Sequence, residues 1–136
     1  MNVPLSDFKS ECGVRQKTIV SREKLNRHIA QNVDNCSVRQ LKIDGYAITE
    51  NIKKCDYLVL NDDKCTAYFI ELKGRDISGA INQIENTVVK LKKYLNAYNI
   101  QMRIVYSGKV NSGTISAWQI KNKNAKAGRN KFEENI

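Results

Sequence analysis

The clearest hydrophobic pattern in the chain lies between residues 78 and 99, SGAINQIENTVVKLKKYLNAYN. The apolar side chains there recur at steps of three and four residues, which places them on one side of an α-helix: Ile81, Ile84, Val88, Leu91 and Leu95. Three lysines lie largely off this stripe (Lys90, Lys92 and Lys93), and Ser78 is the expected N-cap. The pattern therefore predicts an amphipathic helix.

Another helix is predicted earlier in the chain, over residues 18–31, TIVSREKLNRHIAQ. Leu25 and Ile29 are four residues apart and would share one helix face. The following NVDN favours a turn and ends the segment. His28 also falls in this helix, and we expect it to be structural or exposed, because the sequence offers it no partner for a general-base role.

Three strand-like runs lie between the two helices. The first, residues 37–48 (SVRQLKIDGYAI), alternates imperfectly and contains Gly45, where a bend is expected. The second, residues 55–60 (CDYLVL), and the third, residues 65–73 (CTAYFIELK), are separated only by the turn cluster NDDK. Because this connection is short, the two runs are predicted to pair as an antiparallel hairpin.

The last third of the chain predicts less regular structure. Residues 101–108 (QMRIVYSG) read as a strand, and residues 114–120 (TISAWQI) are a candidate for one more, with Trp118 packed in the core. Residues 121–136 are polar, basic in their first part, and expected to be mobile. The order helix, three strands, helix, strand predicts an α/β fold in a single domain, 1–136, with its core over about 18–120.

The composition is globular with a clear excess of positive charge. Hydrophobic residues make up 41% and charged residues 27%, a balance that allows a continuous core. Lysine and arginine number 23 against 14 aspartates and glutamates, a formal net charge of +9. Such a surface favours polyanionic partners, with nucleic acid ahead of an anionic membrane.

The cysteines indicate the redox compartment. None of the four (Cys12, Cys36, Cys55 and Cys65) belongs to a C-x-x-C pair, and with one histidine in the chain a zinc site has little support. We expect reduced thiols, with no bridge between Cys55 and Cys65. No signal-peptide pattern opens the sequence and no apolar stretch reaches transmembrane length, so a cytoplasmic protein without membrane contact is expected.

The third strand-like run ends in an unusual way, because Glu71 and Lys73 follow the apolar residues 68–70. Side chains alternate along a strand, so Glu71 and Lys73 project from one face. Asp56 opens the neighbouring strand, and in an antiparallel hairpin the start of one strand lies beside the end of the next. These three side chains are therefore predicted to converge at one end of the hairpin.

Two carboxylates and an amine at one place suit metal-assisted phosphate chemistry. Carboxylate oxygens can hold Mg²⁺ or Mn²⁺, which keeps several waters and accepts phosphate oxygens as further ligands. The metal polarises the phosphate and lowers the pKa of a bound water, and the lysine can orient that water.

Asp56, fourteen further residues and then Glu71-Leu72-Lys73 resemble the D…(D/E)-x-K signature of the PD-(D/E)xK nuclease superfamily. The element order over residues 18–107 is similar to its restriction-endonuclease-like αβββαβ core, a mixed central sheet flanked by helices. Members are mostly Mg²⁺-dependent nucleases, including restriction enzymes, junction resolvases, repair exonucleases and phage or defence nucleases. The resemblance implies that Asp56 and Glu71 ligate the metal and that Lys73 is the catalytic lysine.

Two further positions match the superfamily more loosely. Several subfamilies add an acidic residue from the first helix, a place that Glu23 could fill as a metal ligand, and many place a glutamine on the helix after E-x-K, as Gln83 would be. The proline that often precedes the aspartate is absent, since Lys54-Cys55 stands there.

Simpler interpretations exist for each of these residues. Glu71 and Lys73 could form an ion pair at a sheet edge, Glu23 could complement a helix dipole, and Gln83 could be an ordinary polar helix position. The expected function is hydrolysis of phosphodiester bonds in DNA, with a homodimer suited to double-strand cutting. Three alternatives stay open: an RNA-directed nuclease such as a toxin acting on tRNA, a non-catalytic nucleic-acid-binding module on the same fold, and a protein-interaction domain.

Overall fold

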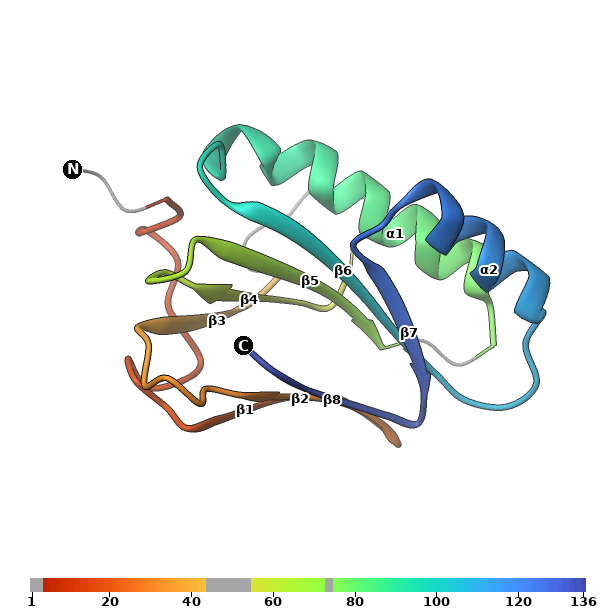
Figure 1. The fold of residues 1–136 in the computed structure, drawn as a ribbon, viewed down its shortest axis with the longest axis horizontal. Coiled ribbons are helices and arrows are strands. Elements are labelled where there is room, and N and C mark those ends of the chain that lie inside the picture. Colours follow the sequence, from red (N-terminus) through yellow and green to blue (C-terminus); the bar gives the residue numbers. More distant parts are fainter. Residues whose placement is uncertain (1–3, 44–54, 73–74) are drawn as a thin grey trace.

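The computed structural model describes residues 4–43, 55–72 and 75–136, which form two β-sheets and two α-helices. Both helices lie on one face of a five-stranded sheet, and a three-stranded sheet lies on its other face, so the molecule has three layers (Figure 1). The fold is a mixed α/β fold in which strands predominate.

The five-stranded sheet has the order β3-β4-β5-β6-β7. Its first three strands are antiparallel and its last three are parallel. The strands are β3 (Val38–Lys42), β4 (Tyr57–Asn61), β5 (Thr66–Leu72), β6 (Asn99–Tyr106) and β7 (Ala125–Arg129). The predicted hairpin is confirmed, since β4 and β5 pair from Asn61 opposite Thr66 to Tyr57 opposite Ile70. The bend expected at Gly45 lies outside the described residues.

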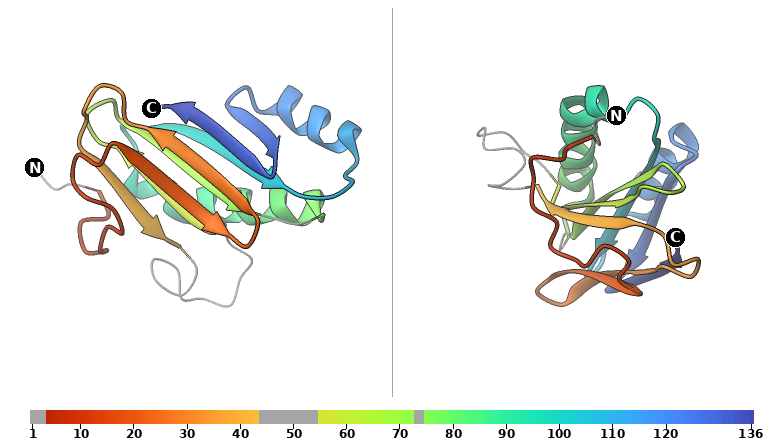
Figure 2. Two further views of the ribbon diagram at one scale, coloured as in Figure 1. Left: turned by 90° about the horizontal axis from the view of Figure 1, so that it is seen from below. Right: turned by 90° about the vertical axis from the view of Figure 1, so that its left-hand side faces the viewer.

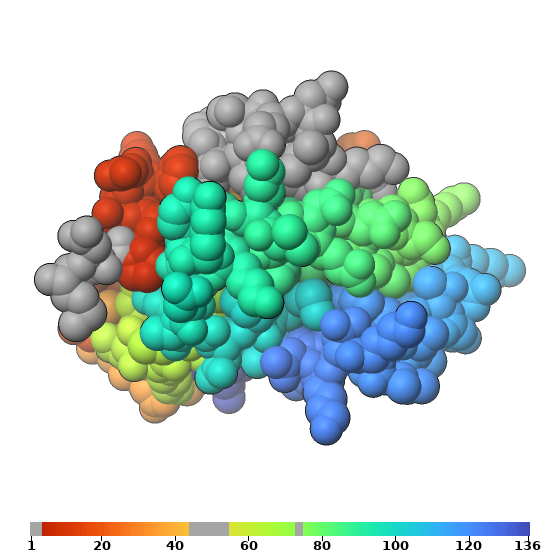
Figure 3. Space-filling model, turned by 90° about the horizontal axis from the view of Figure 1, so that it is seen from above, coloured from red at the N-terminus to blue at the C-terminus, as the bar shows by residue number. Residues whose placement is uncertain are grey.

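The predicted amphipathic helix is confirmed as α1 (Ile77–Leu91), followed by a short 3-10 turn, η1 (Lys92–Tyr94). Of its apolar stripe, Ile84, Leu91 and Leu95 are buried. The N-cap is Asp76 and not Ser78, because the Asp76 carboxylate accepts the Gly79 N–H at 2.8 Å. Figure 3 shows α1 and the second helix, α2 (Ser112–Lys121), side by side on one face of the molecule.

The predicted helix over residues 18–31 is wrong. These residues form β1 (Thr18–Glu23) and β2 (Asn26–Gln31), which pair with β8 (Lys131–Asn135) in the order β1-β2-β8 (Figure 2). Leu25, half of the pair that indicated a helix, is 84% exposed at the turn between the strands. The inward positions of β2 alternate, but two of them are polar (Asn26 and His28), so hydrophobicity alone does not reveal the strand period.

Two predictions for the C-terminal third are also wrong. Residues 114–120 belong to the helix α2 (Ser112–Lys121), whose N-cap Asn111 accepts the N–H groups of Gly113 and Thr114. Trp118 is the buried residue of this helix, so the expectation of a core position for it is confirmed. The segment 121–136, expected to be mobile, supplies the edge strands β7 and β8. Edge strands expose many side chains, and a polar composition is therefore compatible with them.

The core has two parts, one on each face of the five-stranded sheet. Alternation along β5 directs Ala67 and Phe69 toward the helices and directs Tyr68, Ile70 and Leu72 toward the small sheet. The four cysteines are free thiols, which confirms the absence of a bridge between Cys55 and Cys65.

A polar network crosses the layer between the two sheets. Glu134 on β8 accepts hydrogen bonds from Arg103 Nε at 2.7 Å, Arg103 Nη2 at 3.0 Å and His28 Nε2 at 2.7 Å. His28 and Arg103 are 0% and 3% exposed. His28 is therefore structural, as expected, but it lies on a strand and not on a helix. The network ties both sheets together through charge-assisted bonds.

Candidate functional site

The end of the β4–β5 hairpin brings Asp56 beside the last residues of β5. Asp56 precedes the first residue of β4, and its backbone N–H donates to Ile70 O at 3.1 Å. Its carboxylate Oδ2 accepts the N–H of Leu72 at 2.8 Å. The carboxylate of Asp56 is therefore fixed next to Glu71, which lies between the two β5 residues that Asp56 contacts.

Glu71 points toward α1. Its neighbours Ile70 and Leu72 pack between the sheets, so alternation turns Glu71 to the opposite, helix-covered face. Glu71 is 1% exposed, which makes it one of the largest fully buried side chains of the described residues. A buried carboxylate is costly in an apolar environment unless it has a polar partner, and Glu71 does take part in a polar interaction.

The thiol of Cys55 lies where the fields of both carboxylates reach it. Burial raises the pKa of Cys55, and the negative charges of Glu71 and Asp56 raise it further, against an opposing hydrogen bond from Thr87. The β4–β5 register, with Tyr57 opposite Ile70, continues to place Asp56 opposite Glu71, and opposite residues of an antiparallel pair project from the same face. Asp56 and Glu71 therefore lie together on the helix-covered side of the sheet.

Thr87 on α1 anchors the backbone that carries Asp56. Its hydroxyl accepts the Cys55 N–H at 2.8 Å and donates to Gln83 O at 2.7 Å. Thr87 is fully buried. The sequence did predict a helix here, but not this anchor. The available signal was Thr87 itself, a polar residue on the otherwise apolar face of the predicted helix.

Replacing Thr87 with valine is expected to lower the free energy of unfolding by about 1–3 kcal/mol, because the buried Cys55 N–H loses its acceptor. Thr87→Ser keeps the hydroxyl and is the matched control, with a smaller loss expected. Urea denaturation of the two variants measures the difference. Equal stability of Thr87→Val and wild type would show that the anchor is not needed.

Gln83 lies one helical turn before Thr87, on the same side of α1. Since Thr87 contacts Cys55, this side of the helix faces the two carboxylates. The structure thus brings Gln83 to the same layer as Asp56 and Glu71, between α1 and the sheet. It is half-buried.

Glu23 does not join this group in the described structure. Glu23 is exposed at the end of β1, a strand of the three-stranded sheet, which lies on the face of the five-stranded sheet opposite the helices (Figure 1). Glu71 faces the opposite side of the sheet. The predicted first helix that was to carry Glu23 does not exist. Lys73 lies outside the described residues.

The donor set suits a hard divalent cation. Among residues 4–43, 55–72 and 75–136, no three His, Cys, Asp or Glu side chains are grouped to hold a metal ion. Asp56 and Glu71 alone would supply carboxylate oxygens, and Mg²⁺ commonly takes one or two carboxylates and completes its shell with water and phosphate oxygens. The residues present therefore fit Mg²⁺ or Mn²⁺.

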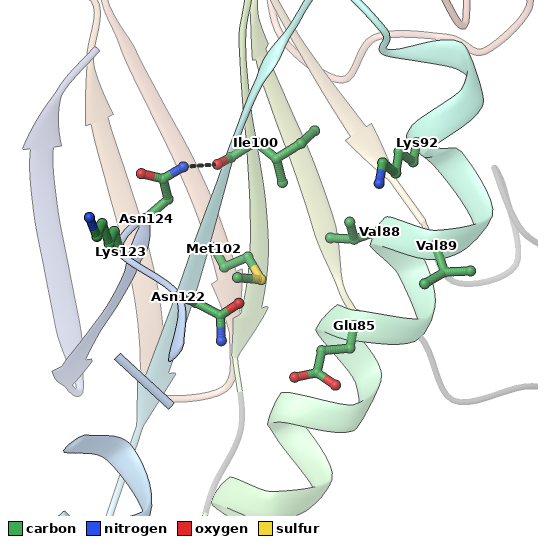
Figure 4. Close-up of a pocket in the computed structure, with 9 residues that line it drawn as sticks. All are labelled: Glu85, Val88, Val89, Lys92, Ile100, Met102, Asn122, Lys123 and Asn124. Atoms are coloured by element: carbon green, nitrogen blue, oxygen red, sulfur yellow. Dashed lines mark hydrogen bonds between the residues drawn. The ribbon is translucent and has the colours of Figure 1, made fainter. Parts of the chain in front are cut away.

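A pocket of about 420 Å³ lies elsewhere on the helix-covered face (Figure 4). Four residues of α1 and η1, the β6 residues Ile100 and Met102, and the connection from α2 to β7 line it. Asn124 Nδ2 donates to Ile100 O at 3.0 Å across one side. The pocket lies toward the start of β6, whereas Glu71 is level with Ile104 farther along this strand. The pocket and the carboxylates are thus separate features.

Comparison of the chain with protein-family models, curated proteins and solved structures found no match. In the part of the chain that the structure describes, no helix is long and apolar enough to cross a membrane.

Proposed function

We propose that this chain is a metal-dependent nuclease that hydrolyses phosphodiester bonds, with DNA as the preferred substrate. The observation that carries the proposal is the convergence of Asp56 and Glu71 at the end of the β4–β5 hairpin, on the face covered by α1. We call these two carboxylates the candidate centre.

The topology supports the proposal. The strands β3, β4, β5 and β6 are adjacent in this order, and α1 connects β5 to the parallel strand β6. This agrees with the βββαβ part of the core that the PD-(D/E)xK resemblance implies, with the acidic residues at the same strand ends. The difference is at the N-terminus, where the β1–β2 hairpin stands in place of the first helix.

Each group has a distinct task in the proposed reaction. Asp56 and Glu71 would hold a Mg²⁺, which would supply positive charge at the scissile phosphate and lower the pKa of a bound water. Lys73, two residues after Glu71, orients the attacking water and offsets negative charge in the transition state. The Leu72 N–H holds the Asp56 carboxylate in place, and Thr87 holds the backbone before it.

The direct test is a cleavage assay with duplex DNA, single-stranded DNA and tRNA, each with Mg²⁺, Mn²⁺ or EDTA. We expect cleavage of DNA that requires a divalent cation and stops in EDTA. Faster cleavage of tRNA than of DNA would redirect the proposal to an RNA-directed nuclease. Binding of DNA or RNA without cleavage under any of the metal conditions would contradict it and favour a non-catalytic module.

A further inference from the structure

Exposed cations gather at the end of the molecule where the parallel strands finish. Parallel strands end at the same edge of a sheet, so the residues after β5, β6 and β7 are neighbours. Arg75 follows β5, Lys109 follows β6 and Arg129 ends β7. Figure 1 shows these strand ends close to the start of α1 and the turn between β7 and β8.

The small sheet adds a fourth, half-buried cation at the same end, Arg27. The Arg27 N–H on β2 donates to Asn130 O at 3.0 Å, and the Asn130 N–H donates to Tyr106 O at 2.7 Å. The start of β2, the β7–β8 turn and the end of β6 are therefore in direct contact. We call Arg27, Arg75, Lys109 and Arg129 the basic edge.

The pairing register places the basic edge beside the candidate centre. Leu72 is opposite Val105, and Val105 is opposite Gly128, so the end of β7 lies two strand spacings from the end of β5, roughly 10 Å. Tyr106 and Arg129 are paired, and the guanidinium lies 5.7 Å from the ring centroid.

Arg75 is held at this edge by a glycine. A Cβ built on Gly108 would lie 2.8 Å from Arg75 Nε, and Gly108 has a φ of +74°. The bare backbone of the β6–α2 connection therefore accommodates the Arg75 side chain. This contact keeps the guanidinium next to the ends of β5 and β6 while the residue stays exposed.

At the opposite end of the molecule, cations are held in ion pairs with carboxylates. Around the β4–β5 turn, three cations have carboxylate partners: Arg39 with Asp62 at 2.7 Å, Lys64 with Asp34 at 2.6 Å and Arg15 with Asp63 at 3.9 Å. Within the described residues, none of the four side chains of the basic edge forms an ion pair with a carboxylate. Concentrated cations of this kind attract a polyanion.

We infer that the basic edge binds the backbone phosphates of a nucleic-acid duplex whose scissile bond lies at the candidate centre. This inference rests on the proposed function. The phosphodiester backbone is the ligand that the two groups together fit, because the cations bind phosphates while the adjacent carboxylates suit metal-assisted hydrolysis. Cations from both sheets take part, so the backbone is contacted across two layers.

The test measures binding without cleavage. A fluorescent 20-base-pair duplex is titrated with protein in EDTA, and anisotropy is followed over a series of salt concentrations. For Arg75→Gln/Arg129→Gln we expect a Kd at least about tenfold higher, and a salt slope smaller by about 2, because each phosphate contact contributes about 0.9 to that slope. Lys92→Gln/Lys123→Gln is the matched control. It removes the same charge from the pocket of Figure 4 and should change Kd less than about twofold.

Equal weakening in both double variants, or none in Arg75→Gln/Arg129→Gln, would overturn the basic edge as the binding surface. Binding to phosphatidylserine vesicles would also overturn it, if that binding depended on these arginines and the protein did not bind the duplex. Because the assay contains EDTA, it is independent of catalysis. If the protein cleaves DNA and the arginine variant binds the duplex as wild type does, only the basic edge is contradicted. If binding depends on the arginines but no cleavage occurs, only the proposed function is contradicted.

Discussion

Glu71→Gln is expected to reduce divalent-dependent cleavage of duplex DNA by at least about 100-fold. Even groups that only support metal ligands contribute about 10–100-fold, and Glu71 is proposed as a ligand itself. The amide keeps the shape of the buried side chain but loses the negative charge that holds the cation. The protein is expected to remain folded, because the substitution leaves no cavity at this 1%-exposed position.

The measurement is the initial rate of plasmid nicking over a Mg²⁺ series, together with calorimetric binding of Mn²⁺. Glu85→Gln is the matched control, since it makes the same change at an exposed position of α1 and should keep the wild-type rate. Asp56→Ala and Lys73→Ala should lose activity as Glu71→Gln does. A Glu71→Gln variant that cuts at the wild-type rate would contradict the candidate centre.

Glu23→Gln distinguishes a centre with three carboxylate ligands from a centre with two. If Glu23 were a third metal ligand, its variant would lose activity with the others. Its exposed position on β1, in the three-stranded sheet across from the helix-covered face, leads us to expect the wild-type rate. We therefore propose a centre with two carboxylates.

Glu134→Gln is expected to lower the free energy of unfolding by about 3–5 kcal/mol, the usual cost of breaking a buried ion pair from one side. Arg103 is 3% exposed and donates to Glu134 through both Nε and Nη2. A neutral amide would leave this buried cation without its counter-charge. Urea unfolding measures the loss. Glu133→Gln changes the neighbouring, exposed glutamate and should stay within about 0.5 kcal/mol of wild type.

The same pair predicts a loss of stability in acid. Burial alone would raise the pKa of Glu134, but hydrogen bonds from His28 and Arg103 outweigh it and lower the pKa to about 2. Because the folded pKa lies below the unfolded one, the stabilisation is complete above about pH 4.5 and disappears as the pH falls toward 2. It amounts to about 3 kcal/mol. Glu134→Gln should lack this part of the pH dependence, and an unchanged acid profile would contradict the assignment.

The sequence predicted the hairpin that carries the candidate centre because its signals were local. An apolar run, a four-residue turn and a second apolar run require no information from elsewhere in the chain, and the alternation along β5 placed Glu71 correctly relative to Ile70 and Leu72. The helix α1 was predictable for a similar reason. Its apolar residues recur with one period throughout, that of an α-helix.

The three-stranded sheet was not predictable, because its inward polar residues form hydrogen bonds with residues that are far away in the sequence. His28 is buried and Glu134 half-buried, and Glu134 takes its hydrogen bonds from His28 on β2 and from Arg103 on β6. Read locally, a strand with lysine and two glutamates resembles a solvated tail. The basic edge was missed for a related reason: its four cations come from separate connections, and only the strand register brings them together.

The pairing of β2 with β8 has a consequence for folding kinetics. The His28–Glu134 contact spans 106 positions, so its formation carries the closure entropy of nearly the whole chain. The β1–β2 hairpin can form early from local contacts, but its third strand must wait until β6 and β7 have assembled. We expect the docking of β8 to come late, after a species in which the inner face of the large sheet is still open to solvent.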